Sequence, residues 1–421
     1  MEEAEKGEIF KMNTKPSSMK EAEKGEVFER NTRLRLDNHP EATAEAPSLF
    51  TDDIILEILS RLPARSVHRF KCISVSWRNL IADPANRKKL PQTLAGFLYF
   101  TTDNIGHHHQ FASISGRAPP FDPSLPYLQP NKYKDMTQVD ACNGLLLYRG
   151  SNNKLVAWNW AKDDFHFVVC NPVTGRWVEL PPSPQSPENR FSCIAGLAFD
   201  PAVSSHFYVL QFEQTFQGSY ITAVNIYSSR TRAWTRRDSG MVEKVVLFYL
   251  TRCVFVGGMM YLMGIHKGIN EENVLVGVDM EVKVWKIIRV PYSSGVGTLG
   301  SSQGCLHFAI ASQDQLNKEL VSEIELWCLK DRDSKELVQK HTASIDKLMS
   351  TTELGYRVAE IHPDCDTIFQ GSYGGDTLAA YDMRHQKVCC ILNLETNITQ
   401  WHRFLPYVPL CSESLADADG Q

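Results

Sequence analysis

A turn followed by a tryptophan recurs in the second half of the chain and limits the folds that it can adopt. A small polar residue stands six positions before each tryptophan, in the pairs Asn171 and Trp177, Ser228 and Trp234, and Asp279 and Trp285. The polar side chain can hydrogen-bond the backbone of its own turn. The turn then delivers a strand whose tryptophan we expect to pack between sheets as a core residue rather than as a ligand platform. Weaker copies, with Leu or Val in place of Trp, run from Asp331 to Leu337 and from Asp382 to Val388.

The length of the repeat favours one architecture. The tryptophans are 57 and then 51 residues apart, which suits one four-stranded sheet per repeat, slightly longer than the roughly 40–50 residues of a β-propeller blade. An unrelated series of hairpins in a sandwich or barrel is the alternative. Three tryptophans in register with their turn residues favour the propeller.

Strand-like segments fill the chain after residue 90. β-branched and aromatic residues alternate with Gly, Pro, Asn, Asp and Ser turns. The expected strands are 96–100, 144–148, 165–170, 206–212, 221–227, 254–264, 274–280, 304–310, 323–329, 377–383 and 387–394. Residues 335–350 are the main exception and can hold a short helix.

A short helical unit precedes these strands. Thr51 can cap a helix whose first turn holds Asp52 and Asp53, where carboxylates suit the helix dipole. Pro63 ends this helix and can start the next, and a third helix runs up to Pro84. About 36 residues are too few for a robust independent core, so part of the apolar surface is expected to belong to a partner or to the next domain.

The helical unit resembles an F-box, the three-helix motif that binds Skp-type adaptors. The resemblance covers 49–84, with "ILSRLP", "RFKCIS", "SWRNLI" and the closing "DP". The usual Leu-Pro opening is Leu49-Phe50 here, and Val75 stands where a Lys is common. An ordinary helical hairpin packed on the propeller is the alternative. By resemblance, adaptor contact falls on Leu49, Ile54, Ile58, Leu59, Leu62, Pro63, Val67 and Trp77, some of which must also hold the three helices together.

The strand-rich part resembles the F-box-associated region of plant F-box proteins, which is related to kelch-type propellers. The phrases "CNGLLLY", "VVCNPVTGRWVELPP", "GLAFDP" and "VNIYSSRTRAW" carry the resemblance, together with the kelch-like pair Gly257-Gly258. The expected fold is therefore multidomain: an all-α F-box at 49–90, followed by a mainly-β, propeller-like domain at 94–415.

Residues 1–46 differ from the rest of the chain. "EAEKGEIFKMNT" recurs as "EAEKGEVFERNT" 18 residues later, a period too short for a domain repeat. Abundant Glu and Lys with few large apolar residues predict a disordered charged tail. A role as a docking tail is the alternative.

Composition excludes several classes of function. A net charge of -5 over 421 residues argues against nucleic-acid binding as the main role. No run approaches 18 apolar residues, and the N-terminus lacks a signal-peptide pattern. The 11 cysteines show no CxxC pair or framework spacing, which indicates reduced thiols and a nuclear or cytoplasmic protein.

No constellation typical of catalysis or metal binding is present in the sequence. His107-His108-His109 is expected to be a solvated loop, since adjacent residues of an extended segment point in different directions. His362 and Cys365 in "HPDC" are better explained by turn chemistry. Neither an enzyme, a metal site nor a cofactor is predicted, because no hydrolase, metalloprotease or nucleotide fingerprint occurs. Loops are the expected place for ligand contact, with candidates at 103–117, 183–191, 213–219 and 265–273.

The resemblance implies a substrate-recognition subunit of a Skp–cullin–F-box ubiquitin ligase. The F-box would bind the adaptor, and through it a cullin, while the β domain would hold a target protein that the sequence does not name. A non-degradative F-box scaffold or a ligand-binding propeller is the alternative. Neither a nucleic acid nor a membrane is an expected partner.

Overall fold

The fold is known from a computed structural model. The tail with its duplication lies outside the described residues, which are 50–62, 66–67, 70, 74–82, 86, 89–90, 94–102, 107–116, 118–128, 135–151, 165–184, 194–201, 203–214, 220–248, 252–268, 270–291, 297–313, 321–344, 356–372, 377–394 and 404–410. None of the described helices is long and apolar enough to cross a membrane.

Two helices of the F-box region are delimited by the described residues. Helix α1 runs over Asp52–Ser60, and Thr51 is its N-cap in extended conformation but makes no side-chain capping bond. Helix α3 runs over Val75–Ala82, and the Ser74 hydroxyl accepts the Trp77 backbone N–H at 3.1 Å. Between them, Ser66, Val67 and Phe70 are helical, as the prediction of a second helix after Pro63 requires.

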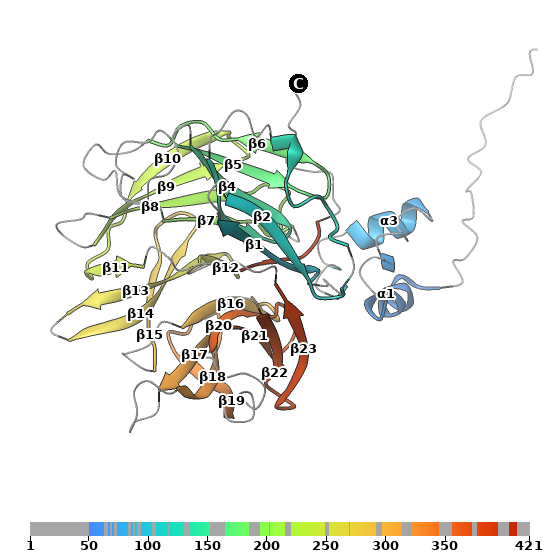
Figure 1. Cartoon of the computed structure of the whole chain (residues 1–421). Coiled ribbons are helices and arrows are strands. Elements are labelled where there is room, and N and C mark those ends of the chain that lie inside the picture. Colours follow the sequence, from blue (N-terminus) through green and yellow to red (C-terminus); the bar gives the residue numbers. More distant parts are fainter. Residues whose placement is uncertain are drawn as a thin grey trace, which may run out of the picture. The chain divides into compact units, whose positions relative to one another are not determined.

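The strands form six sheets, which Figure 1 shows arranged as the blades of a propeller. Blade 1 has the order β24-β1-β2 and blade 2 the order β3-β4-β5-β6. Blade 3 is β7-β8-β9-β10, and in blade 4 both β11 and β12 pair with β13, followed by β14 and β15. Blades 5 and 6 are β16-β17-β18-β19 and β20-β21-β22-β23. All pairings within the blades are antiparallel.

The strands have the following residue ranges, in chain order. In blades 1 to 3 they are β1 Gly96–Thr102, β2 His107–Ser113, β3 Asp135–Cys142, β4 Leu145–Ser151, β5 Phe165–Asn171, β6 Arg176–Glu179, β7 Ile194–Ala198, β8 Tyr208–Gln214, β9 Ile221–Ser228 and β10 Ala233–Asp238. In blades 4 to 6 and at the end they are β11 Val245–Leu247, β12 Val254–Val256, β13 Met259–Lys267, β14 Glu271–Asp279, β15 Trp285–Arg289, β16 Thr298–Ser302, β17 Cys305–Gln313, β18 Val321–Leu329, β19 Leu337–Ser344, β20 Tyr356–Ile361, β21 Thr367–Ser372, β22 Thr377–Asp382, β23 Lys387–Asn393 and β24 Leu405–Tyr407. A short 3-10 turn covers Pro126–Leu128.

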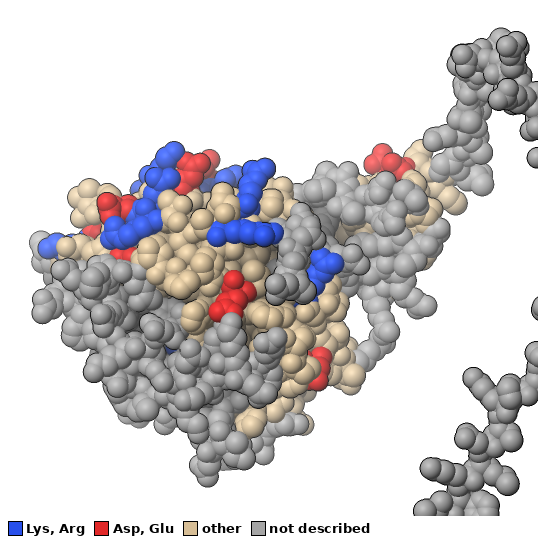
Figure 2. Space-filling model, turned by 90° about the horizontal axis from the view of Figure 1, so that it is seen from above, with Lys and Arg blue, Asp and Glu red and all other residues tan. Residues whose placement is uncertain are grey.

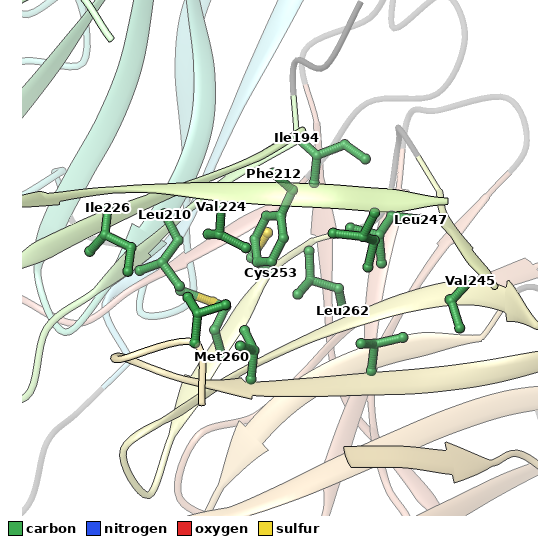
Figure 3. Close-up of a cluster of buried hydrophobic side chains, with 14 of the residues drawn as sticks. Ile194, Leu210, Phe212, Val224, Ile226, Val245, Leu247, Cys253, Met260 and Leu262 are labelled. Atoms are coloured by element: carbon green, nitrogen blue, oxygen red, sulfur yellow. The ribbon is translucent and has the colours of Figure 1, made fainter. Parts of the chain in front are cut away.

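The ring is closed by the last strand of the chain and by apolar contacts between blades. Strand β24 pairs with β1, so the C-terminal part completes the first blade. Each pair of neighbouring blades shares one buried cluster, and six such clusters complete the circle. Figure 3 shows the cluster between blades 3 and 4, where Phe212, Leu210 and Val224 meet Met260 and Leu262. Burial of this apolar surface between sheets is the main force that holds the ring.

The predicted turn motif lies in the same place in five blades. It joins the third strand to the outermost strand of blades 2 to 6. The Asn171 carboxamide accepts the Val173 N–H at 3.2 Å, and the Asp279 carboxylate accepts the N–H groups of Lys283 and Val284 at 2.8 and 3.1 Å. The two weaker copies do the same, because Asp331 and Asp382 each accept two backbone N–H groups of their own turns.

The three tryptophans pack between blades, as predicted. Trp177, Trp234 and Trp285 are half-buried against three successive inter-blade clusters. Trp234 Nε1 donates to the Pro181 carbonyl at 2.7 Å, and Trp285 Nε1 donates to the Ser239 carbonyl at 2.8 Å. Each acceptor follows the outermost strand of the preceding blade, so these indoles tie neighbouring blades together.

All eleven predicted strands are present, with two corrections. Residues 335–350 were expected to hold a short helix, but Leu337–Ser344 is strand β19, because it pairs with β18 as the outer strand of blade 5. Residues 254–264 are two strands rather than one, since Gly257 and Gly258 adopt left-handed φ angles of 61° and 81° and turn the chain between β12 and β13.

Candidate binding surfaces of the F-box and the propeller

Three apolar side chains stand exposed along the start of the F-box. Phe50, Ile54 and Ile58, here called the F-box stripe, are 51%, 48% and 45% exposed. They are spaced four residues apart, and Ile54 and Ile58 therefore lie on one face of α1. The opposite face buries Ile55, Leu56 and Leu59. Helix α1 therefore presents an apolar face beyond the one that its own core uses.

The residues predicted to contact an adaptor fall into three groups. Ile54 and Ile58 are exposed, whereas Leu59 and Val67 lie in the small core at 0% and 3% exposure. Leu62 and Trp77 are half-buried against the same core, and the Trp77 ring is 5.3 Å from that of Phe70. Leu49 and Pro63 lie outside the described residues. Adaptor contact by these side chains stays a prediction, and among the described ones Ile54 and Ile58 expose apolar surface that the core does not use.

Phe50 belongs to the stripe but was not among the predicted contacts. It was singled out only as a departure from the usual proline. Its exposure next to Ile54 makes it a candidate contact, and the four-residue steps from Phe50 to Ile54 and on to Ile58 are the signal that could have revealed it.

A pocket opens at the centre of the propeller, on the axis around which the blades are arranged. Each of the six blades contributes residues from or next to its innermost strand, including Asp140, Leu197, Val254, Ser301, Ile361 and Pro406. The pocket, here called the axial pocket, therefore belongs to the whole ring. Its walls also carry Arg252, Asp200 and Asp364.

Two buried acidic side chains, Asp140 and Glu360, lie at equivalent places in blades 2 and 6, and Asp140 lines the axial pocket. Strand β3 has a bulge between Gln138 and Asp140, and β20 has one between Val358 and Glu360. A bulge adds one residue and re-aims the side chain that follows it. Each carboxylate then accepts the N–H of the next residue, at 2.8 Å for Asp140 and 3.0 Å for Glu360. Both side chains are nearly inaccessible, at 2% and 1% exposure.

Arg252 connects these two carboxylates. It lies two residues before β12 of blade 4, and its Nη1 is 2.7 Å from Glu360 Oε2, while its Nε is 3.7 Å from Asp140 Oδ1. Its Nη2 also donates to the Ala141 carbonyl at 3.3 Å. One guanidinium thus joins blades 2, 4 and 6, and Asp140 reaches blade 3 as well, by accepting the Leu197 N–H at 2.8 Å.

The charged groups of this network shift each other's pKa values. Burial raises the pKa of Glu360 to about 7, although Arg252 acts in the opposite direction. Burial also opposes the charged form of Arg252, but Glu360 and Asp140 outweigh it and raise the pKa of the guanidinium. Two buried carboxylates share one cation, so a proton on Glu360 would leave the network neutral.

A second polar cluster surrounds Asp366 between blades 5 and 6. Its carboxylate accepts hydrogen bonds from Lys340 at 2.6 Å, His341 at 2.9 Å and Gln303 at 2.8 Å. Burial acts to raise the pKa of Asp366, but these donors outweigh it and lower the pKa to about 2. Asp366 is therefore ionised at neutral pH and acts as a tie between the two blades.

The other candidate sites have structural explanations. The histidine triplet was expected in a loop, but it begins strand β2 and pairs with Thr102, Thr101 and Phe100. Neighbouring side chains of a strand point to opposite faces. In "HPDC", His362 Nδ1 accepts the Asp364 N–H at 3.0 Å, so turn chemistry is confirmed. Among the described residues no three His, Cys, Asp or Glu side chains are grouped as a metal site.

Most of the predicted ligand loops lie in strands or outside the described residues. Parts of 103–117 and 265–273 belong to β2, β13 and β14, while 185–191 and 215–219 are not described. The residues of the axial pocket were missed altogether. Their sequence signal is weak, because the strands that carry Asp140 and Glu360, DMTQVDAC and YRVAEI, mix polar and apolar residues without a motif.

Comparison with known protein families assigns this chain to a family. The model of the F-box protein At3g26010-like β-propeller matches residues 121–414, and that of the F-box domain matches residues 48–89. The chain belongs to this family of F-box propeller proteins. The two matches fall on the parts that the structure shows as a helical unit and a six-bladed ring.

Two proteins similar to this chain are F-box proteins of Arabidopsis thaliana. F-box protein At5g49610 is 26% identical over 61% of this chain and 68% of its own length, and F-box protein At5g07610 is 28% identical over 44% of each. Among solved structures, the Dos1 propeller has a TM-score of 0.36 at 11% identity, covering 72% of this chain and 69% of that one.

The family membership settles the coarse function. An F-box implies binding to a Skp-type adaptor, and the F-box, the propeller and the F-box relatives support a substrate-recognition F-box protein. The matching family is described as a β-propeller and not as a kelch repeat, so the relation to kelch propellers stays a prediction.

Proposed function

We propose that this chain is the target-recognition subunit of a Skp–cullin–F-box ubiquitin ligase. The F-box binds the adaptor and through it a cullin, while the propeller holds a target protein. Other subunits perform ubiquitin transfer, and this chain contributes proximity and orientation. The protein is not an enzyme in this proposal.

The observation that carries the proposal is the F-box stripe. About half of each of these side chains is exposed to water. Covering that apolar surface by a partner stabilises the complex by about 25 cal/mol per Å². Phe50, Ile54 and Ile58 form such a surface on the motif whose family binds adaptors.

The propeller supports the second half of the proposal. Its six sheets form a closed ring with inter-blade cores, and a rigid scaffold of this kind presents loops and a central pocket for binding. We further propose that the protein acts in the nucleus, the cytoplasm or both. The eight described cysteines that are free support a reducing compartment.

The test compares two variants of the full chain in cells. Ile54→Glu/Ile58→Glu places two charges on the F-box stripe, and Val203→Glu/Val242→Glu places two charges at exposed valines of the propeller as a matched control. We expect only the stripe variant to lose the adaptor and cullin on co-purification.

Target abundance separates degradation from scaffolding. Proteins that bind the propeller should accumulate when the stripe variant replaces the wild type, and a proteasome inhibitor should mimic this accumulation. If the wild type binds the cullin but the abundance of the proteins bound to the propeller is the same with the wild type and with the stripe variant, a non-degradative scaffold would be supported instead.

A further inference from the structure

The outer hairpin of blade 3 has an unusual charge. This hairpin, residues 228–238, comprises the end of β9, the turn and strand β10, and is here called the basic hairpin. It holds four arginines and one aspartate, a net charge of +3 in a chain whose total is -5. Figure 2 views the molecule from the side of β6 and β10 and shows Lys and Arg side chains gathered on that face.

The other blades provide an internal comparison. The hairpins that begin with Asn171, Asp279, Asp331 and Asp382 occupy the same place in blades 2, 4, 5 and 6. Over the same eleven positions their net charges are 0, +1, 0 and +1. The fold of the hairpin therefore does not require the positive charge of blade 3.

The backbone of the turn points to the same conclusion. Arg232 has a left-handed φ of 54°, at the position that Gly175 fills in blade 2 with a φ of 69°. Each donates its N–H to the carbonyl of the residue four positions earlier, Ser228 or Asn171. A side chain in this conformation costs about 1–2 kcal/mol relative to the right-handed region. Gln386 fills the same position of the blade 6 turn with a φ of 50°, so the turn accepts glycine or glutamine there as well as arginine.

One of the four arginines, Arg236, is paired with acidic side chains of its own blade. Arg236 contacts Glu213 at 3.2 Å and Asp238 at 2.7 Å. Arg230 and Arg237 are exposed and form no ion pair within the described part of the chain. Glu281 raises the pKa of Lys283 on the neighbouring blade, and the nearby charge of Arg237 opposes this rise.

We propose that the basic hairpin binds an extended acidic segment of a target protein. The proposal rests on the proposed function, in which the propeller holds the target. Strand β10 is the outermost strand of its sheet, so its outer edge can receive an extended chain. Strand β10 has six residues, about 20 Å of extended chain, and a segment of about six residues carrying several Asp or Glu matches this length.

An acidic protein segment fits these charges better than a nucleic acid. A protein that binds duplex DNA tightly can make about 6–10 phosphate contacts, whereas this hairpin carries four arginines, one of which already pairs with Glu213 and Asp238. Charges on an edge strand also prevent sheets from associating. The blade 5 hairpin has a balanced set of charges at the same place, so a single sign is not needed for that purpose.

The test uses a labelled peptide and the full chain. The probe is a 12-residue peptide of alternating Glu and Gly, and its binding is measured by fluorescence anisotropy at low and moderate salt. The variant Arg230→Gln/Arg232→Gly/Arg237→Gln removes the three charges. The matched control Lys330→Gln/Arg332→Gln/Lys335→Gln removes three exposed cations at the blade 5 hairpin.

We expect the blade 3 variant to weaken peptide binding about tenfold, the control to change it less than about twofold, and added salt to weaken wild-type binding. Equal loss in both variants, or equal binding of a Gln-Gly peptide, would overturn the proposal. Stronger binding of a single-stranded RNA of equal length would overturn the partner class. Adaptor co-purification of the same variants is expected to be normal, so a failure of the adaptor assay in the wild type would contradict the proposed function alone.

Discussion

The innermost strands and the outer hairpins of this propeller are stabilised in different ways. In the outer hairpins, an Asn or Asp bonds the backbone of its own turn within five residues. Around the axis, the bonds connect residues far apart in the chain. Asp140 bonds Leu197, Cys253 donates to the Ala195 carbonyl, and Thr298 donates to the Val358 carbonyl.

This difference follows from the geometry of a ring. The outer hairpin is a local structure that its own sequence can specify. The innermost strands of neighbouring blades belong to different sheets, and side chains such as Asp140 and Thr298 make bonds between them, beside the backbone bond from the Gln303 N–H to the Pro363 carbonyl at 2.7 Å. Loss of an inner contact should therefore disturb several blades, whereas loss of the Asn or Asp bonds within an outer turn should disturb that turn alone.

The largest effect is expected at Arg252. Replacing it with Ala leaves Asp140 and Glu360 buried without their cation, which should lower the free energy of unfolding by about 3–5 kcal/mol. Urea unfolding followed by tryptophan fluorescence measures the loss. The exposed pair of Lys267 and Glu271 is the control, since Lys267→Ala should cost less than about 1 kcal/mol.

Neutralising all three partners tests the reason for this loss. The variant Arg252→Met/Asp140→Asn/Glu360→Gln has no buried charge and should be more stable than Arg252→Ala. If Arg252→Ala costs no more than Lys267→Ala, the axial network does not hold the ring.

The pH dependence of stability should report on Glu360. Its pKa is raised from 4.5 to about 7 by burial, so the folded protein binds a proton that the unfolded chain releases. The contribution is fully present below about pH 4.5 and is lost as the pH rises through about 7. Thermal unfolding between pH 5 and 8 should therefore show a decline that is smaller in Glu360→Gln. An identical decline in both proteins would contradict the assignment.

A smaller effect is expected where two inner strands touch. A Cβ on Gly196 of β7 would lie 2.6 Å from Cys253 Cβ at the next blade. Gly196→Ala should therefore lower the free energy of unfolding by about 1–3 kcal/mol. The swap Gly196→Ala/Cys253→Gly removes the clash and should regain part of the loss. A swap that regains nothing would show that this contact is not the cause.

The smallest effect is expected in an outer hairpin. Asp279→Ala removes the acceptor of two backbone N–H groups at a turn that water can reach, and should cost about 1 kcal/mol. Asp279→Asn keeps an acceptor oxygen and should cost less. A loss as large as that of Arg252→Ala would erase the distinction between inner and outer contacts.

The same distinction explains what the sequence could predict. The turn residues Asn171 and Asp279 and their tryptophans predicted the repeat, the outer hairpins and the propeller, because these signals lie within a few residues. The inner strands β3, β7, β16, β20 and β24 were missed. Polar residues such as Asp140, Glu360 and Ser302 break up the apolar pattern of these strands, because the contacts that they make lie in other blades rather than on a local face.

The binding surfaces were predicted in part for a related reason. The F-box motif pointed to helix α1, but it could not separate Ile54 and Ile58, which are exposed, from Leu59, which is buried. Apolar residues occur on both faces of α1, so helical spacing alone does not show which face is buried. Arg252 could not be assigned, because its partners lie 112 and 108 positions away in the chain.

The affinity of the full chain for a purified Skp-type adaptor, measured by titration calorimetry, tests the central claim most directly. If the F-box stripe is the docking surface, Ile54→Glu/Ile58→Glu should weaken binding by at least about tenfold, while Val203→Glu/Val242→Glu should bind like the wild type. Unchanged affinity in the stripe variant, with both variants folded, would contradict the account.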